Sequence, residues 1–427
     1  MRVLWTSNIL LPDVTETMGL PNPLSGSWMT ALAKELTTRQ PEIVLGVVTM
    51  HPAAAPGKQV IRNVAYYILP CRKRDAARSP NERLRRHFAE VVADFRPDLI
   101  HINGSELNYG LLVSQVAPGV PAVLSIQGLV GQCAKVYWGG IGFWDLVRFR
   151  TFRDWLRLDG LIEQRWKWQR RSHIETEVLL RMHHVVGRTV WDRAHTRVAN
   201  PDAVYHIGQE LLRREFYETQ WKLGHACRGT IFSCAGGYPL KGLHVLLEAV
   251  CLLKRDYPGV RLRIPGIKLG PGSWRERIRL DGYRKYLAHL IRVMGLDDNV
   301  VALGALDAKA MAAELAQSHV FVAPSFVENL SNSLAEAMLV GTPCVASYVG
   351  GMVSTVHDRI EALSCPAGDA AMLAERIRSL FADDALAQTL SENARRTARA
   401  RHDPEQITKQ IVSIYHAVLE DPVMVNA

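Results

Sequence analysis

The chain has 427 residues, of which 48% are hydrophobic and 22% are charged, as in an ordinary globular protein. Its length predicts two or three domains, and because no apolar run reaches about 18 residues we expect no transmembrane helix. The seven scattered cysteines include no Cys-x-x-Cys pair, which argues against a disulfide framework or a zinc site and favours a reducing compartment.

The net charge of +9 is concentrated in the first half of the chain. Residues 1–200 carry 26 Lys+Arg against 17 Asp+Glu, whereas the remainder carries 25 of each. Two stretches, 71–88 and 142–171, hold much of the excess. The second stretch interleaves its arginines with four tryptophans, Trp144, Trp155, Trp166 and Trp168.

Basic and aromatic residues mixed at helical spacing suit an anionic membrane surface. On this interpretation residues 72–86 and 144–171 would bind peripherally to such a surface. A solvated basic helix with its tryptophans packed inward explains the pattern equally well. Nucleic acid is less favoured, because no helix-turn-helix, RNP or zinc-finger pattern is present.

Short apolar runs alternate with helical patterns along most of the chain. The predicted strands are 2–7, 43–49, 98–102, 122–126, 183–187, 230–234, 260–266, 299–304, 319–324 and 343–347. Runs of Val, Ile and Leu that alternate with helices predict parallel sheets covered on both faces. Two such series indicate an α/β protein with two tandem doubly wound, Rossmann-like domains facing a cleft.

The first predicted domain is 1–205, with the basic insertion at about 142–171, and the second is 206–403. The last segment, 404–427, holds a helix that follows a complete second domain. We expect this helix to cross back onto the first domain.

The stretch 324–343 combines a polar loop with a short apolar helix. Ser331, Asn332 and Ser333 suit a helix N-cap, and Gly341 suits its end, so the helix follows the strand 319–324 directly. A helix N-terminus at the carboxyl end of a parallel strand favours an anion. Glu328 precedes this helix in the loop.

Glu336 lies within the same helix, and two interpretations of it remain open. Its carboxylate is placed to accept hydrogen bonds from hydroxyl groups such as those of a ribose. Alternatively, SLAE (333–336) is a capping box in which Glu336 bonds the cap amide.

Two further stretches place glycines before a helix. In SCAGGYPLKGLHVLLEAV (233–250), Lys241 and Gly242 open a long apolar helix, and a lysine there suits a phosphate. This is not a P-loop, because no Gly-Lys-Ser/Thr is present. In LSGSWMTALAKEL (24–36), Gly26 precedes a helix of the first domain.

Together these stretches resemble a known enzyme family. PSFVENLSNSLAEAMLVGTPCVASYVGG (324–351) is similar to the E-x7-E signature of retaining, nucleotide-sugar-dependent glycosyltransferases of GT-B fold. GYPLKGLHVLLEAV (237–250) is similar to the Lys-Gly segment of that family. GRTVWDRA, YHIGQELLRREFY, GSWMTALAKEL and PDLIHINGSE resemble family 4-like bacterial members that build surface polysaccharides such as lipopolysaccharide. The resemblance covers nearly the whole chain except the Trp/Arg-rich insertion.

The resemblance implies roles for individual residues. Glu336 would bind the nucleotide ribose, and Glu328 would hold the donor sugar and diphosphate. Lys241 would neutralise the diphosphate leaving group, with Gly26 approaching from the first domain. The amides that would join Glu328 are those of Asn329, Leu330 and Ser331. A lysine and a helix N-terminus can stabilise a departing diphosphate without metal, so we expect neither a metal nor a cofactor.

The sequence departs from the family pattern at several positions. The usual arginine before the lysine is replaced by Gly236. Either another cation takes its place, Lys268 or an arginine of the basic half, or the donor is held more weakly. Gln127 stands where a histidine is usual, and Ser354 where a glutamate is common. Gln127 and Asn103 are candidates for contacts to the sugar or the acceptor.

The sequence thus predicts a retaining hexosyltransferase that moves a sugar from a nucleotide diphosphate to a glycan or lipid-linked acceptor. Its expected location is the cytoplasm, on the inner face of the cell membrane, without nucleic acid as a partner. Two alternatives remain: a nucleotide-sugar epimerase of similar fold, and a non-catalytic membrane-docked binding module. The first would alter the donor without an acceptor, and the second would not turn it over.

Overall fold

The computed structural model describes residues 1–20, 27–52, 57–267 and 280–421. Its internal contacts divide the chain into two compact units. The first unit comprises Met1–Gly131, Gln169–Leu212 and His402–Ala427, and the second comprises Gln132–Trp168 and Arg213–Arg401.

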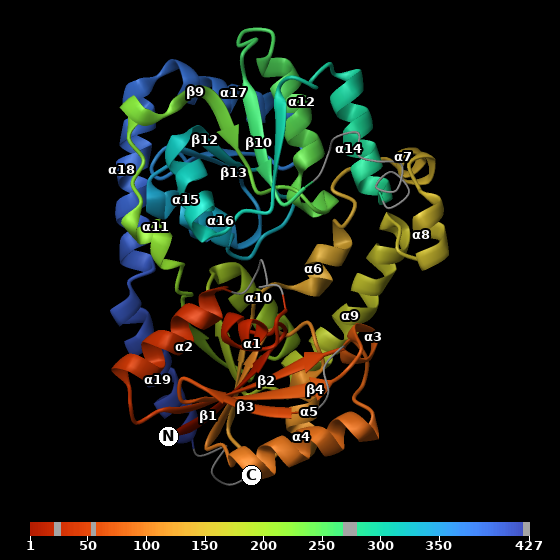
Figure 1. The fold of residues 1–427 in the computed structure, drawn as a ribbon, viewed down its shortest axis with the longest axis vertical. Helices are drawn as coiled ribbons and strands as arrows, with labels where there is room; N and C mark the ends of the chain where they lie inside the picture. The colour runs from red at the N-terminus through yellow and green to blue at the C-terminus, as the bar shows by residue number, and fades with distance from the viewer. Residues whose placement is uncertain (21–26, 53–56, 268–279, 422–427) are drawn as a thin grey trace. The chain divides into compact units, whose positions relative to one another are not determined.

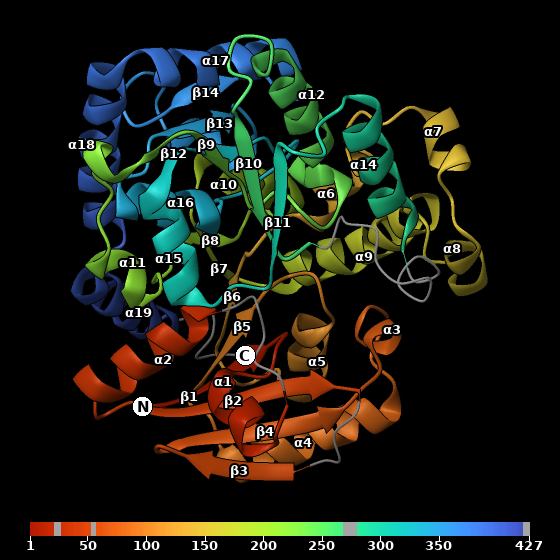
Figure 2. The same cartoon turned by 45° about the horizontal axis from the view of Figure 1, so that its top comes forward.

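The first unit is built on an eight-stranded sheet with the order β3-β4-β2-β1-β5-β6-β7-β8. Every neighbouring pair is parallel except β3 and β4, which are antiparallel. Figure 2 shows β1 to β4 lying side by side. The strands are β1 (Arg2–Ser7), β2 (Val44–His51), β3 (Gly57–Ile61), β4 (Val64–Pro70), β5 (Leu99–Asn103), β6 (Ala122–Ser125), β7 (His184–Gly187) and β8 (Val204–Ile207).

Helices cover the strands of this unit. They are α1 (Pro12–Thr17), α2 (Ser27–Arg39), α3 (Lys73–Ala76), α4 (Glu82–Phe95), α5 (Tyr109–Val116), α10 (Val190–Ala199) and α19 (Pro404–Leu419). Two further helices, α6 (Val130–Lys135) and α9 (Leu161–Arg181), contain two of the four points at which the chain passes between the two units.

The C-terminal helix α19 packs on the sheet of the first unit, as predicted. Its apolar side chains, including Ile407 and Ile414, join a core that contains Val3 and Trp5 of β1. The hydroxyl of Tyr415 accepts a hydrogen bond of 2.9 Å from Trp5 Nε1. This buried contact fixes a helix from the end of the chain against its first strand.

The second unit is built on a six-stranded sheet with the order β11-β10-β9-β12-β13-β14, parallel throughout. The strands are β9 (Cys227–Phe232), β10 (Arg261–Pro265), β11 (Val300–Gly304), β12 (Ser318–Ala323), β13 (Cys344–Ser347) and β14 (Leu363–Cys365). Two helix groups flank this sheet (Figure 1). They are α12 (Leu243–Leu253), α14 (Gly282–Val293) and α17 (Ala370–Ala382), and α11 (Arg214–Glu218), α15 (Ala308–Gln317), α16 (Asn332–Val340) and α18 (Asp384–Arg401). The predicted fold of two doubly wound α/β domains is confirmed.

The units differ from the predicted domains at one place that bears on function. Residues 132–168, with α7 (Phe143–Arg148) and α8 (Phe152–Arg157), belong to the second unit. They include most of the basic insertion, about 142–171, that the sequence placed in the first domain. The return of the chain to the second unit falls after Leu212 rather than after residue 205. Among the described residues, no helix is long and apolar enough to cross a bilayer.

Candidate functional site

The loop between β12 and α16 positions Glu328. Every residue of β12 is buried, and Pro324 ends the strand. The hydroxyl of Ser331 caps α16 by accepting a hydrogen bond of 3.4 Å from the amide of Leu334, and Gly341 ends the helix with φ of 87°. The first amides of α16 therefore lie at the carboxyl end of a buried parallel strand, where a helix N-terminus favours an anion.

Two glycines from other segments pack closely against the backbone of this loop. A Cβ on Gly242 would lie 1.9 Å from the carbonyl oxygen of Pro324, and one on Gly350 would lie 2.1 Å from that of Glu328. Both glycines have positive φ, of 72° and 51°. The neighbouring Gly351 amide donates a hydrogen bond of 3.0 Å to the Glu328 carbonyl. These close approaches require glycine and fix the backbone at Glu328.

Lys241 and Glu328 form an ion pair at this point. The side chains are 28% and 12% exposed, and Ser325 Oγ donates a hydrogen bond of 2.8 Å to Glu328 Oε1. Burial opposes the charge of Lys241, but Glu328 and Tyr238 more than compensate and raise the lysine pKa above its usual range. Lys241 is therefore a stable cation at neutral pH.

Glu336 is held by an arginine rather than by the helix cap. Arg213 donates from Nε and Nη2 to the two carboxylate oxygens of Glu336, each at 3.0 Å. Burial raises the pKa of Glu336 to about 7, although Arg213 acts in the opposite direction. Because the N-cap is Ser331, two residues before the predicted capping box, the capping interpretation of Glu336 is wrong.

Cys234 lies two residues beyond the end of β9. Burial and Glu336 raise the pKa of its thiol, whereas Lys241 and Arg213 lower it. Each of the two ion pairs has its carboxylate in the segment that follows β12, on either side of the N-terminus of α16. This combination can hold an anionic ligand that also carries hydroxyl groups.

The segment 132–168 of the second unit, which contains most of the insertion, reaches the same loop. His244, at the start of α12, contacts the Gly139 carbonyl through Nε2 at 2.7 Å, and its ring stacks on Phe326 of the loop with centroids 5.7 Å apart. Trp168 packs against Tyr238. The insertion is therefore part of the wall around Lys241 and Glu328.

A separate pocket of 690 Å³ lies in the first unit, beyond the carboxyl ends of its parallel strands. Its surface is mostly apolar. The lining residues are Asn8, Ile9, Leu10, Thr15, Leu20, Met50, His51, Pro52, Cys71, Ala76, Ala77, Glu106, Leu107 and Arg171. Burial raises the pKa of Glu106, and its carboxylate accepts a hydrogen bond from Asn8.

The remaining predicted residues lie in different surroundings. Asn329 and Leu330 are buried between Glu328 and the start of α16. Gln127 lines a small cavity of the first unit. Its backbone carbonyl accepts a hydrogen bond of 2.6 Å from Nη2 of Arg188. Asn103 is buried at the end of β5, and neither it nor Gln127 lines the larger pocket. Gly26 and Lys268 lie outside the described residues.

Sequence reasoning did not identify Arg213. The residue lies 123 positions from Glu336, in the stretch 205–217, whose sequence indicated a domain boundary and a family resemblance but no partner for Glu336. A buried glutamate needs a cation or hydrogen-bond donors, so a cation partner for Glu336 was the one signal available.

Comparison with known proteins finds similarities to the second unit. Residues 220–397 match the family described as glycosyl transferases group 1. The N-acetyl-alpha-D-glucosaminyl L-malate synthase of Bacillus anthracis is 30% identical over 135 residues, 32% of this chain and 35% of its own length. The phosphatidyl-myo-inositol mannosyltransferase of Mycobacterium leprae is 29% identical over 181 residues, 42% of this chain and 44% of its own length. The chain thus matches less than half the length of these curated relatives.

The fold is also that of solved structures. Anabaena HepE in complex with UDP-glucose superposes with a TM-score of 0.67 over 98% of this chain and 100% of its own, at 16% identity. At this identity the likeness shows the two-domain α/β fold alone. The sequence match and the fold agree, and residues 220–397 of the chain are similar to the glycosyl transferases group 1 family.

Proposed function

We propose that this protein is a retaining glycosyltransferase that moves a hexose from a nucleotide-diphosphate sugar to a glycan or lipid-linked acceptor. The observation that carries the proposal is the pair of ion pairs near the start of α16, Lys241 with Glu328 and Arg213 with Glu336. All of these residues except Arg213 lie inside the stretch 220–397 that matches the family. The UDP-glucose bound by a protein of the same fold supports the donor class.

The chemistry follows from the charges. When the bond between the sugar C1 and the diphosphate breaks, negative charge develops on the leaving phosphate. Lys241 and the amides before α16 stabilise that charge. Arg213 is a candidate to replace the family arginine, because this chain has Gly236 at that position. In the proposed front-face reaction the leaving phosphate takes the proton of the acceptor hydroxyl. These protein groups supply the positive charge, so the proposed reaction needs no metal ion.

In this proposal the acceptor binds to the first unit. The pocket of 690 Å³ is mainly apolar and contains one buried acid, Glu106. Such a pocket suits an acceptor with an apolar portion and a hydroxyl group that the acid orients. A relative whose name specifies a phosphatidyl-myo-inositol acceptor supports the lipid-linked class.

A donor screen followed by product analysis tests this function. We expect one nucleotide sugar among UDP-, GDP- and ADP-sugars to raise the melting temperature of the full chain. With an acceptor, the product should keep the anomeric configuration of the donor and should form in the presence of EDTA. An inverted product, an isomerised donor sugar without acceptor, or no turnover of any donor would contradict the proposal.

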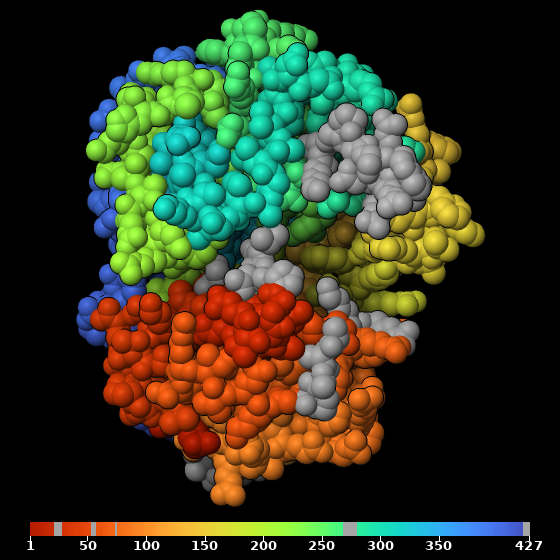
Figure 3. All heavy atoms as spheres, in the orientation of Figure 1, coloured from red at the N-terminus to blue at the C-terminus, as the bar shows by residue number. Residues whose placement is uncertain are grey.

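We also propose that the second unit binds anionic membranes through the insertion. Three of the tryptophans predicted to enter the lipid are exposed to solvent: Trp144, Trp155 and Trp166 are 80%, 60% and 61% exposed. The helices α7 and α8 lie on the surface in Figure 3 (yellow). Other exposed apolar side chains of this segment are Phe143, Val147, Phe152, Leu156 and Leu158. Exposed apolar side chains in this number, next to exposed Arg148 and Arg157, suit a headgroup layer.

Liposome co-sedimentation checks this surface. Replacing Trp144 and Trp155 by alanine should weaken binding to anionic vesicles by at least about tenfold, because less apolar area enters the lipid. Salt should weaken binding of both proteins, since each basic residue contributes about 1 kcal/mol. A matched control replaces two exposed valines of the first unit, Val60 and Val198, and should bind like the wild type. Equal binding to neutral and anionic vesicles would contradict the proposal that the insertion binds anionic membranes.

A further inference from the structure

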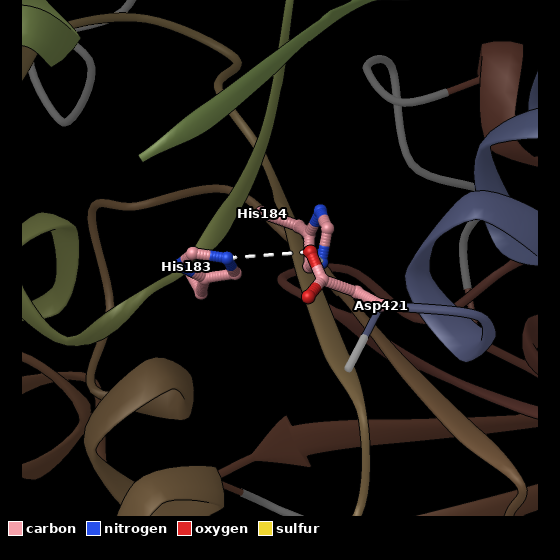
Figure 4. Close-up of side chains that lie close together, drawn as sticks. All are labelled: His183, His184 and Asp421. Atoms are coloured by element: carbon pink, nitrogen blue, oxygen red, sulfur yellow. Dashed lines mark ion pairs between the residues drawn. The ribbon is translucent and has the colours of Figure 1, made fainter. Parts of the chain in front are cut away.

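Two histidines and an aspartate meet in the first unit, outside the donor residues. His183 and His184 lie at the start of β7, and Asp421 follows the end of α19. Figure 4 shows the carboxylate of Asp421 turned toward both imidazole rings. Its Oδ2 lies 3.4 Å from Nε2 of His183 and 3.3 Å from Nε2 of His184.

These distances fit a shared cation better than hydrogen bonds. A hydrogen bond between a ring nitrogen and an oxygen is usually about 2.9–3.0 Å long. A tetrahedral Zn²⁺ with bonds of about 2.0–2.1 Å keeps neighbouring ligand atoms roughly 3.3–3.5 Å apart. The three candidate ligand atoms lie within 4.8 Å of one another, and the ring of His183, which is 27% exposed, has room to close the remaining distance.

The burial of His184 also suits a metal. Its side chain is only 2% exposed, and among the described residues its Nε2 has no hydrogen-bond partner. A buried polar atom in a native structure usually has a partner, and a metal ion would supply one here.

A second histidine orients this ligand. Nδ1 of His184 lies 3.0 Å from Nε2 of His206, on β8. When Nδ1 donates to His206, the lone pair of His184 Nε2 faces the carboxylate of Asp421, and two electron-rich atoms then stand opposite each other. A cation between them removes the repulsion. In a metal-bound histidine, the ring nitrogen that does not bind the metal usually donates a hydrogen bond to a neighbouring group.

We propose that His183, His184 and Asp421 bind a divalent transition-metal ion, with Zn²⁺ as the best fit. Two imidazoles and one carboxylate are ligands that Zn²⁺ accepts, and a water would complete four-coordination. The ion ties the end of α19 to the start of β7, both within the first unit. Its role is to stabilise this unit and does not depend on the glycosyltransferase activity.

Metal binding by the full-length chain tests the site. After removal of metal with EDTA, the wild type should bind one Zn²⁺ in calorimetry, and saturating Zn²⁺ should raise its melting temperature by about 2–4 °C. His183→Ala and Asp421→Asn should fold, because both side chains are partly exposed, but should lose the binding and the shift. His184 is left unchanged because it is buried.

Two control variants and a second ion complete the experiment. His225→Ala and Asp202→Asn alter an exposed histidine and an exposed aspartate elsewhere and should retain the full Zn²⁺ response. Mg²⁺, which prefers oxygen ligands in octahedral geometry, should give no shift. Absence of stoichiometric Zn²⁺ binding in the wild type would overturn the site. So would an equal shift in the wild type and in both His183→Ala and Asp421→Asn.

Discussion

Lys241→Ala should lower kcat/KM for sugar transfer by about 10²–10³, the usual loss when one donor to a developing oxyanion is removed. The expected weakening of nucleoside-diphosphate binding is roughly 10- to 100-fold, since hydrogen bonds to charged groups contribute about 1.5–3 kcal/mol. Its melting temperature should fall only modestly, because Glu328 is partly exposed and keeps its hydrogen bond from Ser325. Steady-state kinetics, calorimetry with the free nucleotide and thermal unfolding measure the three quantities.

Two variants separate the charge of Lys241 from its place in the fold. Lys241→Arg keeps a cation beside Glu328 and should retain part of the activity. Lys254→Ala removes a lysine just after α12, where it donates a hydrogen bond to the Gly295 carbonyl, and should leave transfer unchanged. Wild-type kinetics in Lys241→Ala would show that Lys241 does not stabilise the diphosphate. Equal losses of kcat/KM in Lys241→Ala and Lys254→Ala would show the same.

The parallel sheets were predictable because strands such as β1, β5 and β12 are buried on both faces and are rich in apolar residues. The strands that were not predicted are β3, β4, β8 and β14. β3 and β8 are edge strands with exposed or half-buried residues, and β14 has only three residues. Weak periodicity explains the omission of β3 and β8, and short length that of β14. β4 is a mostly buried apolar run, and its omission has neither cause.

The site was predictable where one stretch of sequence builds it. Glu328, Ser331 and Gly341 follow from local turn and cap chemistry, and Lys241 from its place before a helix. Arg213 and the packing of Gly139 on His244 depend on contacts between residues far apart in sequence. The cysteine pattern had argued against a zinc site, but it carries no information on His183, His184 and Asp421, which only the fold brings together.

Glu336 should give donor binding a characteristic pH dependence. Because burial raises its pKa to about 7, the carboxylate that accepts ribose hydroxyls forms mainly between pH 6 and 8, and donor affinity should rise over this range. Folding stability should change in the opposite direction. The folded pKa lies above the usual value of 4.5, so this group's contribution to stability is complete below that value and is lost as the pH rises through 7. Calorimetry and thermal unfolding across this range check both trends.

Glu336→Gln should abolish this dependence and lower donor affinity, and a ribose analogue shows whether the hydroxyl groups are involved. The wild type should bind the nucleoside diphosphate about 10- to 100-fold more tightly than its 2′,3′-dideoxy form, because the analogue leaves buried acceptors unpaired. Glu336→Gln should bind both forms with nearly equal, weak affinity.

The ion pair with Arg213 requires a second comparison. Glu336→Gln and Arg213→Met should each lower the melting temperature, because either change leaves a buried charged group without its partner. The double variant should recover much of that stability but should still fail to distinguish the ribose forms, whereas Arg213→Met alone should keep some preference for the natural ribose. A double variant that distinguishes the two nucleotides like the wild type would show that Glu336 serves only to neutralise Arg213, and that the ribose is bound elsewhere.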